Sequence, residues 1–310
     1  MVKKMVSIRS KMLIKMLLKN REHIFDMSTI EEFRETVDNM NAKIKLPKDV
    51  NLEELQIGNI PAEKYLLQVK DSEYAPSKVM LYLHGGGYIF GSYKGYRSFV
   101  TKMCKKLHVN AYCFNYGLAP EDPFPAGLDD AFFVYEWLLE EESIPAENII
   151  LMGDSAGGGL ALALLVRIKK KNLPMPKAAI CLSPWTDLTL KSETMKSKIE
   201  DEVFFNVRNV EISAEAYLGE ASPENPEVSP LFADFEGFPP IFIQVGSREI
   251  LLDDSVKIAE KMRKQDVKVT LDVHIGMFHA FLFFAQIPFI GSAREFKHAI
   301  KNIQMFVERL

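Results

Sequence analysis

The stretch LMGDSAGGG, residues 151–159, decides the fold class of this chain. An apolar run, NIILMG, leads into it, and a helix-like run, LALALLVRI, follows it. Its centre has the form Gly-x-Ser-x-Gly between a strand and a helix, which is the context of a nucleophile elbow. Gly153 and Gly157 would relieve crowding on either side of Ser155 and leave its hydroxyl exposed.

Two other interpretations of this turn are a phosphate-binding glycine loop and an ordinary strand–helix connection. A Walker loop is excluded because no Gly-Lys-Ser/Thr ending follows. On the catalytic interpretation Ser155 is the nucleophile, and Asp154 belongs to the motif that supports it. The helix that begins there points its N–H groups and the positive end of its dipole toward the site.

A second glycine motif, LYLHGGGYIFG (81–91), also follows an expected strand. A serine nucleophile needs backbone N–H groups for the oxyanion of its tetrahedral intermediate. We expect Gly85 and Gly86 to supply two of them and Ala156 the third. His84 and Gly87 would shape this loop; the alternative is a flexible turn without a binding role.

A serine nucleophile also needs a base. The histidines are His23, His84, His108, His274, His279 and His298. A base must rotate and reach the serine, so a loop at the carboxyl end of a strand is the right place for it. His279, in IGMFHAF, follows the last expected strand in such a loop. We therefore predict that His279 is the general base.

The third member of a triad, an acid, would come between the serine and the histidine in the chain. The segment VGSREILLDD (245–254) follows an apolar strand and carries Glu249, Asp253 and Asp254. The residues alone leave the choice among these three carboxylates open.

The rest of the chain alternates short apolar runs with helix-like stretches, which predicts a largely parallel sheet covered by helices. Six strands are expected, over 78–84, 110–116, 148–153, 178–183, 240–246 and 269–275. We expect residues 1–60 to form a mostly helical segment and residues 61–310 the catalytic domain. The polar stretch 188–226 interrupts the alternation and is interpreted as an insertion over the sheet.

The 310 residues are 47% hydrophobic and 26% charged, which is ordinary globular composition. A net charge of -4 argues against a nucleic-acid partner. Three widely spaced cysteines predict no disulfide framework and no metal site. The basic N-terminus lacks the apolar core of a signal peptide, so we expect a cytoplasmic protein. Its helical face predicts packing on the protein, with a membrane-surface helix as the alternative, and no stable membrane insertion.

Five segments together resemble the hormone-sensitive-lipase-like branch of the α/β-hydrolases. They are HGGGYIFGS, NYGLAPEDPFPAGLDD, GDSAGGGLA, LSPWTDLT and SPLFADFEGFPPIFIQVGSREILLDDS. Their order and spacing match over essentially all of residues 28–310. The resemblance implies an α/β-hydrolase fold: a mostly parallel eight-stranded sheet with helices on both faces. It also implies a helical cap made by the N-terminal helices and the 188–226 insertion.

The resemblance implies that Ser155 is the nucleophile, His279 the base, and Gly85, Gly86 and Ala156 the oxyanion donors. Its Gly-x-x-Asp-x-Leu-x-Asp pattern falls on Gly246, Glu249, Leu251 and Asp253, which places the triad acid at Glu249. Asp253 would then cap the following helix or hold the loop, and Asp254 would face solvent.

Two positions depart from the family pattern. Glu249 replaces the more common aspartate, and glutamate is an accepted triad acid in this fold. Gly117 stands where the family often has arginine, so a charged link to a neighbouring loop is expected to be missing.

The expected activity is that of a serine carboxylesterase on short acyl esters, with no cofactor and no metal. Two alternatives remain: a deacetylase of acetylated sugars or small natural products, and a non-catalytic small-molecule receptor. The expected partner is a small ester, and homo-oligomer formation stays open. Candidate pocket walls are Phe90, Phe204, Phe205, Phe281 and Phe284.

Overall fold

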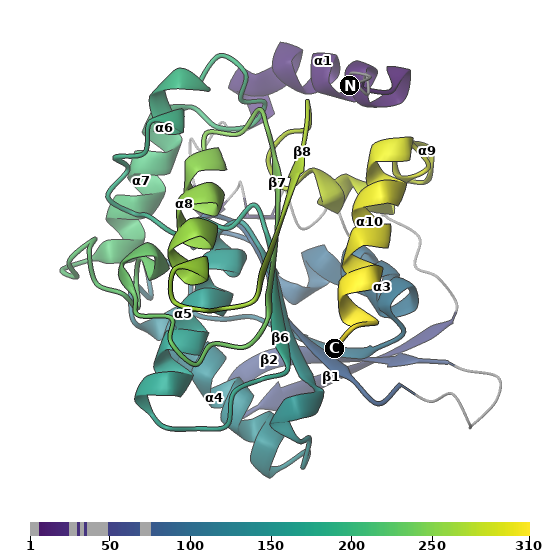
Figure 1. Ribbon diagram of the computed structural model, residues 1–310, viewed down its shortest axis with the longest axis vertical. Helices are drawn as coiled ribbons and strands as arrows, with labels where there is room; N and C mark the ends of the chain where they lie inside the picture. Colours follow the sequence, from purple (N-terminus) through teal and green to yellow (C-terminus); the bar gives the residue numbers. More distant parts are fainter. Residues whose placement is uncertain (1–5, 25–29, 32–33, 36–48, 69–75) are drawn as a thin grey trace.

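Eight strands form one sheet in the order β1-β2-β4-β3-β5-β6-β7-β8 (Figure 1). The structure is a computed structural model and describes residues 6–24, 30–31, 34–35, 49–68 and 76–310. From β4 to β8 along this order all neighbours are parallel, while β2 is antiparallel to both β1 and β4. The strands are β1 (Val50–Ile57), β2 (Ile60–Leu67), β3 (Val79–Leu83), β4 (Asn110–Phe114), β5 (Ile149–Asp154), β6 (Ala178–Leu182), β7 (Ile241–Gly246) and β8 (Val269–His274).

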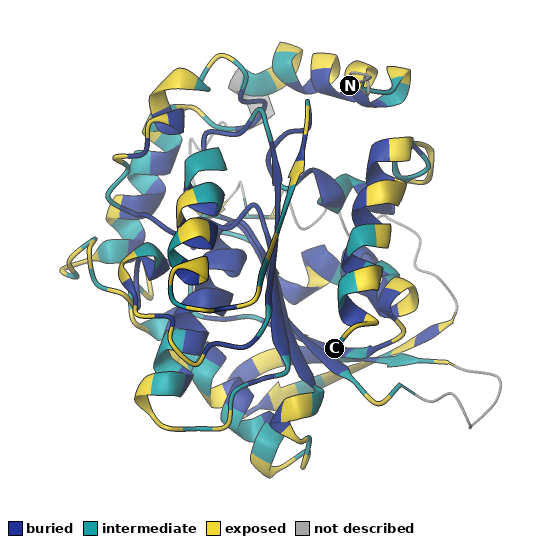
Figure 2. Ribbon diagram, viewed as in Figure 1, coloured by how far each residue is buried: buried dark blue, intermediate teal, exposed yellow. Residues whose placement is uncertain are grey.

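Helices cover both faces of the sheet, and its central strands are buried (Figure 2). Strand β3 contributes to the core on each face, because successive side chains of a strand point to opposite faces of the sheet. Leu81 and Leu83 join the core that includes α4, α5 and α8, whereas Met80 and Tyr82 join the core that includes α3 and α10. These helices are α3 (Tyr93–Leu107), α4 (Ala126–Glu140), α5 (Ala156–Lys170), α8 (Leu252–Arg263) and α10 (Arg294–Val307). The expected α/β-hydrolase architecture is confirmed.

The expectation that residues 1–60 are mostly helical is wrong for its last part. Residues 50–57 form β1, which pairs with β2 through a hairpin whose turn holds Gly58 and Asn59. Gly58 has φ +59°, a conformation that glycine adopts without strain. A Gly-Asn pair between two runs of strand formers is a hairpin signal. The boundary expected at residue 60 therefore cuts through a hairpin of the sheet. The sequence also predicts a helix start at Ser28, from the capping pattern of Ser28 and Glu31, and Ser28 lies outside the described ranges.

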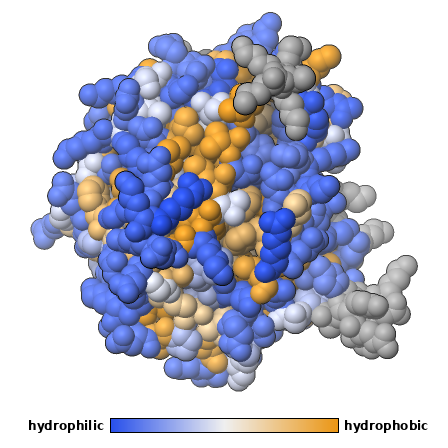
Figure 3. All heavy atoms as spheres, in the orientation of Figure 1, coloured by the Kyte–Doolittle hydropathy of each residue, from blue (hydrophilic) through white to orange (hydrophobic). Residues whose placement is uncertain are grey.

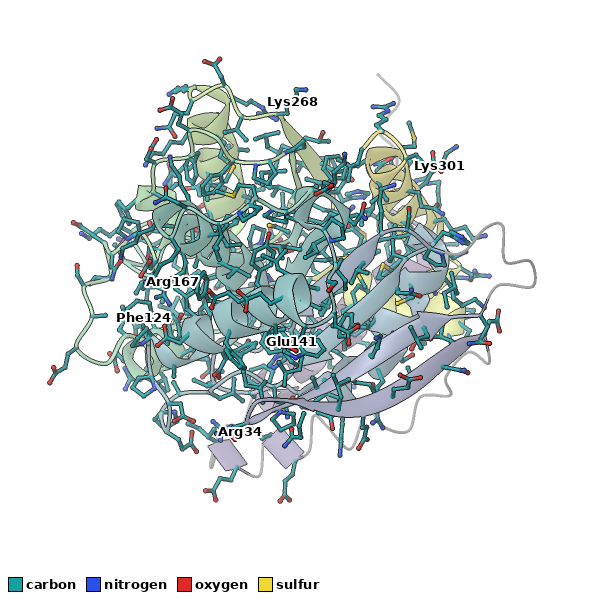
Figure 4. All side chains as sticks on the ribbon, turned by 90° about the horizontal axis from the view of Figure 1, so that it is seen from below. Arg34, Phe124, Glu141, Arg167, Lys268 and Lys301 are labelled. Atoms are coloured by element: carbon teal, nitrogen blue, oxygen red, sulfur yellow. The ribbon has the colours of Figure 1, made fainter. Side chains whose placement is uncertain are left out.

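The 188–226 segment leaves the sheet after β6 and carries α6 (Thr194–Ser197) and α7 (Val207–Leu218). Its end is tied to α5 by Arg167, whose guanidinium lies 3.0 Å from the Glu227 carboxylate (Figure 4). Helix α1 (Ile8–Ile24) lies beyond the carboxyl ends of β7 and β8 (Figure 1). The remaining short helices are η2 (Ala146–Asn148), η3 (Pro230–Phe232), η4 (Phe281–Gln286) and α9 (Pro288–Gly291).

Strand β8 forms one edge of the sheet and carries exposed apolar residues. Val273 and Ile275 are exposed, and an apolar band crosses this part of the otherwise mostly hydrophilic face in Figure 3. In the ranges that the structure describes, none of the helices has the length and apolar character needed to cross a membrane.

Candidate active site

The turn between β5 and α5 holds Ser155 in a strained conformation, with φ 54° and ψ -124°. The strand and helix lie so close together here that the residues two positions before and after Ser155 cannot carry side chains. A Cβ on Gly153 would lie 2.3 Å from the Gly157 carbonyl oxygen, and one on Gly157 would lie 2.1 Å from the Leu83 carbonyl oxygen. The predicted elbow is therefore present, and its two glycines are required by contact with backbone.

Asp154, next to the serine, is a buried anchor for the glycine loop. Its carboxylate accepts hydrogen bonds from Tyr82 Oη at 2.7 Å, Tyr96 Oη at 2.9 Å and the Gly85 N–H at 3.0 Å. Burial raises the pKa of Asp154 above its usual value, although these hydrogen bonds act to lower it. The two tyrosines were not predicted, since hydroxyl partners this far apart in the chain leave no local pattern.

The expectation that Gly85 is an oxyanion donor is wrong. Its N–H is buried and already donates to Asp154 and to Tyr96 Oη. The N–H groups of Gly86 and Gly87 have no recorded acceptor within the described parts of the chain. Ala156 begins α5, so its N–H is one of the four that a helix leaves unpaired. The donors available to an oxyanion are thus those of Gly86, Gly87 and Ala156.

His84 shapes the glycine loop, as expected. Its ring stacks on Tyr116 with the centroids 4.2 Å apart, and its Nδ1 lies 2.9 Å from the Gly85 carbonyl oxygen. Burial lowers its pKa to about 4, so the ring stays neutral. A neutral, stacked imidazole is a packing element here, not a base.

His279 lies in the loop between β8 and η4, and its partner is Glu249 from the turn between β7 and α8. The His279 Nδ1 atom is 2.9 Å from Glu249 Oε2, and both side chains are buried. Burial lowers the pKa of His279, but the hydrogen bond and charge of Glu249, helped by Glu202 and Asp154, raise it above its usual value. This arrangement stabilises the charged imidazolium that a general base becomes.

Ser183 completes the acid side of this pair and was missed in the sequence. Its hydroxyl donates to Glu249 Oε1 at 2.7 Å and accepts the Ala280 N–H at 3.0 Å. One hydroxyl therefore fixes both the acid and the residue after His279. The sequence feature that could have indicated Ser183 was its position directly after β6, at the carboxyl edge of the sheet.

Ser155 and His279 approach the same end of β6. The Ser155 N–H donates to the Leu182 carbonyl at 2.8 Å, and the next residue, Ser183, contacts the histidine loop. Among the described residues, His279 Nε2 has no hydrogen-bond partner, so it is not bonded to the Ser155 hydroxyl. Nucleophile and base are often further apart in an enzyme without substrate than during reaction.

The other two acidic candidates have different surroundings. Asp253 Oδ2 accepts the N–H groups of Glu193 and Thr194, so it holds the insertion and does not cap α8. The expectation that Asp254 faces solvent is wrong: it is 1% exposed and accepts the N–H groups of Thr186 and Asp187. Neither makes a recorded hydrogen bond to a histidine in the part of the chain that the structure describes.

A small cavity of about 30 Å³ lies over Ser155, and residues of the insertion form part of its lining. Most of its lining is apolar, and Phe205 also packs edge-on against the His279 ring, with the centroids 4.9 Å apart. The lining residues are Gly87, Phe90, Ser155, Trp185, Phe205, Asn209, Val210, Ser213, Ile250 and Leu251. Of the five expected phenylalanine walls, Phe90 and Phe205 line it. Phe204, Phe281 and Phe284 belong to the core on the α3 side.

The charged link expected to be missing at Gly117 is supplied from the N-terminal segment. Arg34 forms two hydrogen bonds with the Glu121 carboxylate, at 2.9 and 2.8 Å (Figure 4). The same guanidinium donates to the carbonyls of Ile89 and Ala119. Arg34 thus joins the segment that follows Gly117 to Ile89, next to the glycine loop, and no local pattern around Gly117 could indicate this.

Comparison with known proteins agrees with this geometry. Residues 80–283 match a family model described as the alpha/beta hydrolase fold. An esterase of Acinetobacter venetianus is 36% identical over 241 residues, 77% of each chain. An acetyl-hydrolase of Streptomyces hygroscopicus is 36% identical over 202 residues, covering 65% of this chain and 67% of that protein.

Among solved structures, one of an esterase from the bacterial hormone-sensitive lipase family superimposes with a TM-score of 0.88. It is 33% identical, and the match covers 98% of each chain. The elbow, the second glycine motif and these relatives lead to one conclusion. This chain belongs to the α/β-hydrolase family, in its hormone-sensitive-lipase-like branch, and is a carboxylic ester hydrolase.

Proposed function

We propose that this hydrolase is a serine carboxylesterase for short acyl esters, with Ser155, His279 and Glu249 as its catalytic triad. The observation that carries the proposal is the buried His279–Glu249 pair, 2.9 Å between Nδ1 and Oε2, whose Nε2 is left without a partner in the described structure. A general base needs one ring nitrogen held and the other free to take a proton.

In the proposed reaction His279 Nε2 removes the proton from Ser155 Oγ while Oγ attacks the ester carbonyl carbon. The tetrahedral intermediate collapses when the imidazolium protonates the leaving alcohol, and an acyl-enzyme remains. Water, activated by the same nitrogen, then attacks the acyl carbon and releases the acid. Glu249 keeps the imidazole in the required tautomer and stabilises its charged form.

The oxyanion would be held by the N–H groups of Gly86, Gly87 and Ala156. This proposal replaces Gly85 with Gly87, because the Gly85 N–H already serves Asp154. Gly87 also lines the cavity over Ser155, which the N–H donors of an oxyanion hole must adjoin. The role of Gly85 is then to orient the loop, since a Cβ there would lie 2.4 Å from Asp154 Oδ2.

The size of the cavity supports a short acyl group. The cavity is small, about 30 Å³, and residues of the insertion line it together with Ser155. The apolar lining suits a hydrocarbon group better than a polar sugar ring. The acetyl-hydrolase relative is named for removal of a similarly small acyl group.

Replacing Ser155 with alanine tests the triad. We expect kcat for p-nitrophenyl acetate to fall by about 10⁵-fold, as loss of a triad nucleophile does, while the thermal unfolding midpoint stays unchanged. A fluorophosphonate probe should label the wild-type chain at Ser155 and leave the variant unlabelled. Near-native turnover by the variant, or no labelling of the wild type, would contradict the proposal and favour a receptor.

A panel of p-nitrophenyl esters from acetyl to dodecanoyl tests the acyl length. We expect kcat/KM to be highest for acetyl to butyryl and to fall steeply beyond. A preference for dodecanoyl would refute the short-acyl assignment without touching the triad. Acetylated sugars in the same panel test the deacetylase alternative.

A further inference from the structure

A buried carboxylate in the insertion faces the proposed triad and has no part in the mechanism above. Glu202 lies in the strap, residues 199–205, which connects α6 to α7. Its side chain is 1% exposed. Burying a carboxylate is unfavourable unless hydrogen bonds or charges compensate, so its contacts call for an explanation.

Both carboxylate oxygens of Glu202 are used as acceptors of backbone N–H groups. Oε1 accepts the N–H groups of Val203 at 2.8 Å and Phe204 at 3.0 Å, within the strap itself. Oε2 accepts the N–H of Ile250 at 3.2 Å. All three partners are donors and favour the ionised carboxylate, although burial raises the pKa of Glu202 above its usual value. Ile250 directly follows Glu249, so this side chain clamps the strap to the turn that carries the proposed acid.

Further contacts connect the strap to α1, to the turn that carries Glu249 and to His279. Arg21 of α1 donates to the carbonyls of Ile199 and Glu202, at 2.9 and 3.2 Å. Arg248, next to Glu249, pairs with Asp201 at 3.1 Å. At the end of the strap, Phe205 packs against the His279 ring.

Three carboxylates surround the imidazole. They are Glu249 from the turn after β7, Glu202 from the strap and Asp154 from β5, and each raises the pKa of His279. Asp154 is occupied by two tyrosines and the Gly85 N–H, and Glu249 is bonded to the ring itself. Glu202 is the member of this set that comes from the insertion. The cations nearest to it in the contacts above are Arg21 and Arg248.

We infer that Glu202 is a positioning residue for the proposed triad: it fixes the acid turn through the Ile250 N–H and adds a further negative charge that favours the His279 imidazolium. This inference rests on the proposed function and goes beyond it, because it makes the insertion part of the charge balance of the base. The insertion then has two roles, since it lines the cavity and also sets the pH range in which His279 can accept a proton.

The pH dependence of kcat/KM for p-nitrophenyl acetate tests this in the full-length enzyme. Activity requires neutral His279, so its acidic limb reports the pKa of that histidine in the free enzyme. Removing a nearby negative charge lowers that pKa. Glu202→Gln should therefore move the acidic limb down by about 0.5 to 1 pH unit and lower the plateau by roughly tenfold.

Two matched variants separate charge from packing. Glu202→Asp keeps the charge, so the acidic limb of its pH profile should stay near that of the wild type. If Glu202→Gln does not fold, Glu202→Asp still provides the test. Glu200→Gln removes an exposed charge from the same strap and should leave both limb and plateau unchanged.

An unmoved limb in Glu202→Gln would overturn the inference, whatever happens to its thermal stability. An acidic limb that moves to lower pH in Glu202→Asp would overturn the inference as well, because a structural role of Glu202 would then explain the shift without its charge. A wild-type chain without esterase activity would instead contradict the proposed function, on which the inference depends.

Discussion

Two turns at the carboxyl edge of the sheet hold proposed catalytic residues by different means. The elbow, residues 153–157, is fixed by backbone contacts, because its glycines lie against the carbonyls of Gly157 and Leu83. The acid turn, residues 246–254, is fixed by side-chain hydrogen bonds to Ser183 and to residues of the insertion. A turn fixed by sterics leaves a pattern in its own sequence, whereas a turn fixed by distant partners does not.

The largest effect expected in the acid turn separates its carboxylates. Glu249→Gln should lower kcat/KM by about 10³- to 10⁴-fold with little change in KM, because the imidazole loses its partner charge and its tautomer. Asp253→Asn, four residues on, should change kcat/KM by less than about threefold, since an amide oxygen can still accept the Glu193 N–H. Steady-state kinetics on a short ester check both. If Asp253→Asn were the more damaging, the acid would be misassigned.

The next effect concerns stability and comes from Asp254 in the same turn. Burial raises its pKa to about 7, whereas in the unfolded chain it ionises near 4. The folded state therefore binds the proton more tightly. Its contribution to stability is full below pH 4 and is lost as the pH rises through about 7.

This loss should amount to roughly 2 to 4 kcal/mol between pH 4 and pH 8. Asp254→Asn has no charge to bury, and its amide oxygen can still accept the Thr186 N–H. The variant should therefore gain stability relative to the wild type as the pH rises, measured by urea unfolding at several pH values. Parallel stability curves for the two proteins would contradict the burial argument.

The smallest expected effect tests the steric elbow. Gly157→Ala places a methyl group 2.1 Å from the Leu83 carbonyl, so β3 or α5 must shift, at a cost of about 2 to 3 kcal/mol. Gly237→Ala is the control: it has φ +81° but no atom within 4 Å of the new Cβ, and should cost about 1 kcal/mol. Thermal and urea unfolding measure both. Equal costs would show that crowding does not distinguish the elbow from an ordinary turn.

The same distinction explains what the sequence could predict. The six strands of the parallel part, the elbow and the histidine loop follow from local patterns of apolar runs and glycines. The β1–β2 hairpin was missed although Gly58 and Asn59 mark its turn, because the helical N-terminal segment was extended too far. Gly85 was misassigned because its N–H partner, Asp154, lies 69 residues away.

Arg34 and Glu202 could not be found in this way, and for Ser183 the available signal was its place directly after β6. Each is an ordinary polar residue whose partners belong to other parts of the chain. Their positions depend on the packed arrangement of sheet and insertion, which a single sequence does not specify.

The backbone of Ser155 has one more consequence, for attempts to improve this protein. A side chain held at φ 54° and ψ -124° costs on the order of 1 to 3 kcal/mol, and only glycine is free of that penalty. A screen for heat resistance alone would therefore reward Ser155→Gly, which discards the proposed nucleophile. Activity has to be selected alongside robustness, because at this position the two demands oppose each other.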